Sequence, residues 1–187
     1  MTTTRMSLAT CFMLVCMLAT RAAFAGDGQP RDWRARLKEE LPLLGHRNWI
    51  AVVDSAYPLQ TSAGIETIDT DADHLEVVKA VLAELAKAKH VRPVIFTDAE
   101  LKVVPESDAP GVTAHREALA KLLGKTEALS LPHEQIIAKL DDAGKTFHIL
   151  VLKTNSTIPY TSVFLRLDCG YWTDEAEKRL REKMAAH

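Results

Sequence analysis

One short apolar segment restricts the fold more than any other part of this sequence. Residues 49–56, WIAVVDSA, have the length of a strand and open with an unbroken apolar run. Such a run is typical of a strand covered on both faces, because a strand with one solvated face alternates polar and apolar residues. The segment therefore predicts a layered domain in which other elements pack on both sides of a sheet.

Helical and strand patterns alternate along the rest of the chain. Helices are expected where apolar residues recur every three to four positions, and strands where short apolar runs lie between turn residues. The expected helices cover 31–45, 73–89, 113–124, 131–144 and 173–187, and the further strands cover 91–98, 146–154 and 160–170. This alternation predicts a single α/β layered domain.

The first 25 residues have the pattern of a secretory signal peptide. Arg5 precedes an apolar run at 8–19, which is too short for the roughly 20 residues of a spanning helix, and AFA at 23–25 suits signal peptidase. The mature chain is therefore expected to begin near Gly26, to be periplasmic or secreted, and to meet a membrane only during export. Cys169 is its single cysteine, so the mature chain cannot form an internal disulfide.

Charge and local motifs argue against several classes of function. The 187 residues carry a formal net charge of -2 with mixed signs, whereas a nucleic-acid-binding domain would show a basic face. HEQII at 133–137 lacks the second histidine of the zinc-protease helix, and DTDADH at 69–74 lacks the glycine of a calcium loop. Neither a metal nor an organic cofactor is predicted.

A few polar residues remain as candidates for chemistry: His46, Asp54, Tyr57, His133 and Tyr160. Each has an ordinary explanation on its own. A loop histidine usually bonds nearby backbone, an aspartate at the end of a strand usually caps a turn, and a tyrosine beside a proline usually packs. Spacing alone therefore does not distinguish catalysis from structure.

Two segments of the chain resemble the family of D-ribose pyranases and L-fucose mutarotases. That family has a Gly-His turn, an apolar strand, and an Asp followed by a proline, with the spacing of His46, Asp54 and Pro58. It also has a basic-Thr segment and then Pro-Tyr before an apolar C-terminal strand, and these features match at Lys153, Thr154, Pro159, Tyr160 and 163–165. A family His-Glu stretch is similar to the sequence at His133, and the likeness extends over 43–170.

The resemblance implies a three-layer α/β/α domain with a mixed sheet, covering 26–172 and followed by a charged helix at 173–187. It implies a homo-oligomeric ring, pentameric or decameric, in which the C-terminal segment of one subunit completes the sugar pocket of its neighbour. The implied activity is cofactor-free: an isomerase of the mutarotase type that opens and recloses a monosaccharide ring. Histidine suits this chemistry because its unperturbed pKa lies near 6.5.

The resemblance also implies roles for individual residues. The expected catalytic residues are His46, as acid and base, together with Asp54 and His133. The expected substrate-binding residues are Tyr57, Lys153, Tyr160 and Ser162. A strand between His46 and Asp54 would span about 25 Å when extended, so chain bending or a neighbouring subunit must bring the two together.

Four polar positions depart from the family pattern: Asn48, Asn155, Ser156 and Ser162. They remove two carboxylates and an amide from the expected pocket and keep other interpretations open. The first alternative is an exported, ring-forming protein that binds a carbohydrate or metabolite without turnover. The second is a structural oligomer that has no ligand.

Overall fold

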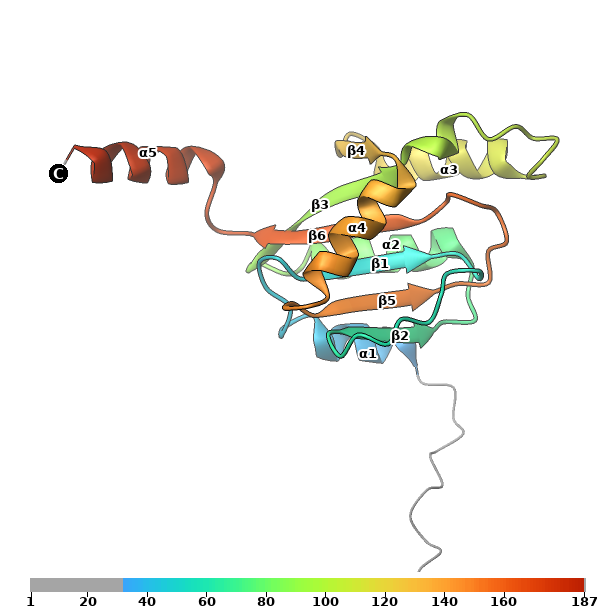
Figure 1. The fold of residues 1–187 in the computed structure, drawn as a ribbon, viewed down its shortest axis with the longest axis horizontal. Helices are drawn as coiled ribbons and strands as arrows, with labels where there is room; N and C mark the ends of the chain where they lie inside the picture. The colour runs from blue at the N-terminus through green and yellow to red at the C-terminus, as the bar shows by residue number, and fades with distance from the viewer. Residues whose placement is uncertain (1–31, 187) are drawn as a thin grey trace, which may run out of the picture. The chain divides into compact units, whose positions relative to one another are not determined.

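A computed structural model describes residues 32–186 of this chain. The expected signal peptide, with Cys11 and Cys16, lies outside the described residues. The described part is built around a six-stranded sheet (Figure 1). Between Asp32 and Ala186, no helix combines the length and the apolar character needed to cross a membrane.

The sheet is mixed, as expected. Its strands are β1 (Trp49–Val53), β2 (Ile65–Asp69), β3 (Val91–Asp98), β4 (Ala128–Leu131), β5 (Ile149–Lys153) and β6 (Val163–Cys169). Their order across the sheet is β2-β5-β1-β6-β3-β4. Only β6 runs antiparallel to its neighbours, so the carboxyl ends of the other strands share one edge of the sheet with the amino end of β6.

Helices cover both faces of the sheet. They are α1 (Trp33–Glu40), α2 (His74–Leu85), α3 (Val112–Leu123), α4 (His133–Ala143) and α5 (Asp174–Ala185), with a short 3-10 turn, η1, at Ala99–Lys102. Ile50 and Val52 of β1 join one core with α1, α2 and α3, whereas Trp49, Ala51 and Val53 join a second core with α4. Figure 1 shows α4 alone on its face and the other three behind the sheet. This arrangement confirms the three-layer α/β/α fold.

The central strands and the helices match the sequence-based expectations most closely. All of β1 is buried, and β3 has the expected bounds. The side chain of Asp73 accepts a hydrogen bond from the backbone of Glu76 at 3.1 Å, which caps α2. The first helix is shorter than predicted and ends before Pro42, because a proline inside a helix removes a hydrogen bond and clashes with the preceding turn.

Two strands were missed because they lie at the edges of the sheet. β2 and β4 are short, and most of their residues are only half-buried. Neither segment has the unbroken apolar run that marks a central strand.

The C-terminal helix α5 has no buried residue. Arg92 of β3 forms an ion pair with Asp174 at 3.2 Å, and Trp172 donates to Glu177 at 2.8 Å. In Figure 1 the helix continues outward from the end of β6.

Candidate functional site

A cavity of about 470 Å³ lies at the edge where the parallel strands have their carboxyl ends. This volume falls in the range of small-molecule pockets, about 300–1,000 Å³, and open α/β sheets bind ligands at this edge. Three segments form its walls: 54–60 after β1, 133–137 in the first turns of α4, and 157–160 before β6. The cavity therefore depends on the order of the strands in the sheet.

His133 is the only histidine among the described residues that line this cavity. It is the first residue of α4, and both carboxylate oxygens of Glu100 accept hydrogen bonds from its backbone N–H, each at 3.0 Å. A carboxylate is favourable there, because the first N–H groups of a helix have no partner within the helix. The imidazole is therefore held at a rigid helix start.

Asp98, at the end of β3, orients the His133 ring. Its Oδ1 lies 3.1 Å from Nδ1 of His133, and its side chain is fully buried. When the carboxylate accepts the Nδ1 proton, Nε2 of His133 becomes the nitrogen available to a ligand. The pair thus has the arrangement in which a buried acid sets the tautomer of a catalytic histidine.

The environment of Asp98 alters its acidity. Burial raises the pKa of the Asp98 carboxyl to about 6, although the neighbouring His133 opposes this change. The carboxylates of Glu100 and Asp54 raise the pKa further by like-charge repulsion. Within residues 32–186, Oδ2 of Asp98 has no hydrogen-bond partner. Asp98 therefore changes charge close to neutral pH, where an ordinary aspartate is already ionised.

Tyr160 forms an aromatic wall of the cavity. Its ring meets His133 edge-on, with ring centroids 5.7 Å apart, and its side chain stays partly exposed. Its φ of 58° is uncommon for a residue other than glycine, and such conformations concentrate at functional sites. The hydroxyl of Thr161 donates to the carbonyl of Ile158 at 2.9 Å, which stabilises the loop around it.

Tyr57 and Asp54, two of the predicted site residues, also line the cavity, but each has a structural partner. Burial raises the pKa of Tyr57 to about 12, so its hydroxyl stays neutral, and it donates to Gln60 at 3.2 Å. Oδ1 of Asp54 accepts the backbone N–H of Ala56 at 2.8 Å, which stabilises the turn after β1. The second carboxylate oxygen of Asp54 is the one that a ligand would use.

Two predicted substrate-binding residues are not among those that line the cavity. The ammonium of Lys153 donates to the carbonyl of Tyr57 at 2.9 Å and so supports the wall from behind. Ser162 is 1% exposed, in the sheet layer just before β6. Within one chain, neither residue belongs to the surface of the cavity.

His46 lies at the opposite ends of the strands, beside the amino end of the central strand β1. It occupies the turn before β1, where Nε2 is 3.4 Å from Oδ1 of Asp168 near the end of β6. Asn48 closes that turn by accepting the backbone N–H of Gly45 at 2.7 Å. Because β1 runs straight between them, His46 and Asp54 do not share a site within one chain.

Two residues that shape the site, Asp98 and Glu100, were not among the predicted site residues. Both belong to the segment at the end of β3. Asp98 is the last residue of a predicted strand, and Asp54 likewise directly follows a strand. Carboxyl ends of parallel strands meet at one edge, so a strand-terminal aspartate was the available signal. Using it required knowing that β3 and β1 run in the same direction.

No family model matches this chain, and no curated protein matches it. Several solved structures are similar to this chain. RbsD from Bacillus subtilis, solved in complex with D-ribose, is 20% identical, with 74% of this chain and 94% of that chain covered and a TM-score of 0.51. The fucose mutarotase from Streptococcus pneumoniae, in complex with L-fucose, is 18% identical, with 75% and 96% covered and a TM-score of 0.46. The similarity to RbsD shows that this chain has an RbsD-like α/β fold, which confirms the expected fold.

Proposed function

We propose that this protein binds a monosaccharide in the cavity at 54–60, 133–137 and 157–160 and accelerates the opening and reclosing of the sugar ring. The observation that carries the proposal is the His133–Asp98 pair, in which a buried carboxylate orients an imidazole at the cavity wall. The resemblance to sugar mutarotases and the RbsD-like fold are in keeping with it.

The proposed reaction transfers one proton between two oxygens of the sugar. His133 takes the proton of the anomeric hydroxyl at Nε2 while the bond between the anomeric carbon and the ring oxygen breaks. The ring oxygen receives a proton from the same imidazolium, so the open-chain carbonyl form results without a net change in protons. Asp98 stabilises the imidazolium during this step, and reclosure on the other face of the carbonyl yields the other anomer.

The other walls suit a sugar. Sugars present hydroxyl groups around a ring with apolar C–H faces, and an aromatic side chain such as Tyr160 can cover such a face. Asp54, Gln60 and Glu134 offer polar groups to the hydroxyls, while Ile137 and Ile158 supply apolar walls. The RbsD structure holds D-ribose, so a pentose is the first substrate class to test.

The role predicted for His46 enters this proposal through a second copy of the chain. His46 is at the far edge of the sheet, so it can reach a cavity only in a neighbouring subunit of a ring. A homo-oligomer is therefore part of the proposal. Export to the periplasm or the medium is a separate part, which rests on the signal-peptide pattern of the first 25 residues.

The test is sugar exchange measured by NMR saturation transfer, using the full-length chain with ribose, fucose, galactose and glucose. We expect exchange above the spontaneous rate for at least one sugar, and loss of that acceleration in His133→Ala. Binding of a sugar without acceleration would favour the alternative, a carbohydrate-binding protein without turnover. If none of the four sugars binds and none is exchanged faster than spontaneously, the proposal is rejected.

A further inference from the structure

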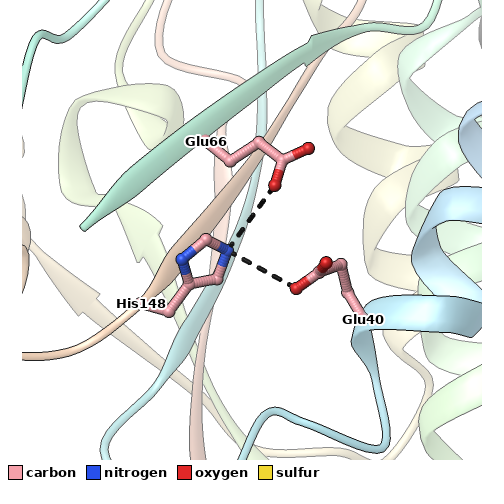
Figure 2. A group of neighbouring side chains, drawn as sticks. All are labelled: Glu40, Glu66 and His148. Carbon is pink, nitrogen blue, oxygen red and sulfur yellow. Dashed lines mark ion pairs between the residues drawn. The ribbon is translucent and has the colours of Figure 1, made fainter. Parts of the chain in front are cut away.

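A second group of polar side chains lies away from the cavity, at the amino ends of β2 and β5. Glu40 ends α1, Glu66 is in β2, and His148 directly precedes β5. Figure 2 shows the imidazole of His148 pointing towards both carboxylates. Residues from three separate elements thus meet at one point near the β2 edge of the sheet.

The distances in this group suit a shared cation better than direct hydrogen bonds. Nε2 of His148 is 3.7 Å from Oε2 of Glu40 and 3.9 Å from Oε2 of Glu66, beyond the range of an N–H···O bond. One ligand atom from each residue lies within 4.8 Å of the others. Zinc ligands lie about 2.0–2.2 Å from the ion, so two of them stand roughly 3.3–3.6 Å apart at a tetrahedral ion, and these side chains would move slightly closer on binding.

Nε2 of His148 is shielded by the carboxylates, although 32% of the His148 side chain is exposed. This nitrogen has no hydrogen-bond partner within the described range 32–186. An unsatisfied buried polar atom costs free energy, so such atoms are rare unless a ligand or water completes them. The backbone carbonyl of His148 accepts bonds from Asn48 at 3.0 Å and from the N–H of Trp49 at 3.2 Å, so the residue is held in place.

Arg36 holds the two carboxylates in position. Its guanidinium donates two bonds of 3.0 Å to Glu66 and contacts Oε1 of Glu40 at 2.7 Å. Arg36 and His148 therefore face different oxygens of Glu40, the more deeply buried of the two acids. Such outer contacts orient metal ligands, although the guanidinium charge also weakens the binding of a cation.

We propose that Glu40, Glu66 and His148 form a binding site for a divalent first-row cation of the zinc class. One imidazole nitrogen and two carboxylate oxygens are ligands that Zn²⁺ accepts, and a water would complete a tetrahedral shell. The ion would join α1 to the β2–β5 side of the sheet. No metal was predicted from local motifs, and such motifs could not link ligands that are 26 and 82 positions apart (66 minus 40, and 148 minus 66).

Isothermal titration of the chelator-treated, full-length chain with Zn²⁺ tests the proposal. We expect one ion per chain for the wild type and binding at least about tenfold weaker for Glu40→Gln, Glu66→Gln and His148→Ala, because each removes one ligand. The matched control is Glu39→Gln, which removes the neighbouring acid that contacts Arg36 at 3.3 Å on the exposed side. This control should keep the wild-type affinity.

Arg36→Met distinguishes a cation site from a plain network of ion pairs. Removing the guanidinium charge should tighten Zn²⁺ binding by about tenfold, since one nearby positive charge is lost. Thermal unfolding supplies a second readout, in which Zn²⁺ raises Tm for the wild type and Glu39→Gln but not for His148→Ala. Absence of stoichiometric binding by the wild type, or unchanged binding in His148→Ala, would overturn the proposal.

Discussion

The two edges of the sheet each hold a histidine next to an aspartate, yet the two pairs differ in their surroundings. At the carboxyl edge, His133 and Asp98 are 3.1 Å apart, with 29% and 0% of their side chains exposed. At the amino edge, His46 and Asp168 are 3.4 Å apart, with 56% and 20% exposed. The first pair borders the cavity, whereas the second faces solvent.

Burial explains why only the first pair is suited to proton transfer within one chain. Water and salt screen an exposed pair, so it influences its members weakly. Asp168 also forms an ion pair with Arg92 at 2.9 Å and accepts a hydrogen bond from the backbone N–H of Cys169. Asp98 has only His133 as a side-chain partner among residues 32–186, so its charge acts on that ring. The same two residue types thus acquire different capacities from their positions in the fold.

The largest expected effect comes from removing the buried imidazole. His133→Ala should lower the catalysed exchange rate by at least about 100-fold, because general acid–base catalysis supplies about 10²–10⁴ of an enzymatic rate. Saturation transfer on the best substrate gives the rate, and thermal unfolding checks that the variant folds. A variant that folds and retains more than half of the wild-type rate would exclude His133 as the acid and base.

A smaller effect is expected from its partner. Asp98→Asn keeps the shape but cannot stabilise an imidazolium, so the rate should fall by about tenfold or more. In the wild type, Asp98 ionises as pH rises through about 6, so the rate should rise across the same interval. Asp98→Asn removes this ionisation, so its rate profile should differ in shape from the wild-type profile around pH 6. Rate profiles of the two proteins that run parallel around pH 6 would contradict the assigned role of Asp98.

A pair of two histidines allows the pH dependence of folding to be separated from that of activity. His74 and His115 lie between α2 and α3 with ring centroids 5.2 Å apart, and burial lowers the pKa of His74 to about 4. Because the folded pKa is below the unfolded value, this group stabilises the fold above about pH 6.5, and the stabilisation is lost as pH falls towards about 4.

His74→Phe should therefore flatten the loss of stability on acidification, since the ring no longer takes up a proton on unfolding. Urea unfolding at about pH 7 and about pH 5 measures the free energy of unfolding, in which a tenfold difference in proton affinity between the folded and unfolded states corresponds to about 1.4 kcal/mol. His46→Phe is the matched control, because its ring is already exposed. If the wild type and His74→Phe lose the same free energy of unfolding between the two pH values, groups other than His74 cause the loss.

The smallest effect is expected at the exposed pair. His46→Ala should change the free energy of unfolding by less than about 1 kcal/mol, as is typical of surface ion pairs. Exchange by a single chain should be unaffected, because His46 is remote from the cavity. In the proposed oligomer, by contrast, His46→Ala should lower exchange with unchanged stability, because a neighbouring copy contributes His46 to the cavity, and sedimentation at several concentrations tests for that oligomer.

The elements of the fold were largely predictable from local patterns. The apolar run at 49–53 indicated a strand covered on both faces, and the start of α2 followed from the pattern at Asp73. The edge strands β2 and β4 were not found, because partial burial leaves no clear period. The resemblance implied the RbsD-like fold, which the structural comparison confirmed.

The candidate site was only partly predictable. Asp54, Tyr57, His133 and Tyr160 line the cavity, whereas His46, Lys153 and Ser162 do not. Family motifs identify residues that act together but do not specify whether one chain or two supply them. The catalytic role of His46 therefore stays a prediction that depends on assembly.

The sequence by itself determined the helices and the central strands, because burial periodicity and capping act over a few neighbouring residues. Only the tertiary structure decided which side chains meet. His133 and Asp98 are 35 positions apart, and Glu40, Glu66 and His148 come from three elements. Such meetings follow from the order and direction of strands, in which β6 alone is antiparallel. That order reflects the packing of the whole domain, which no short stretch of sequence records.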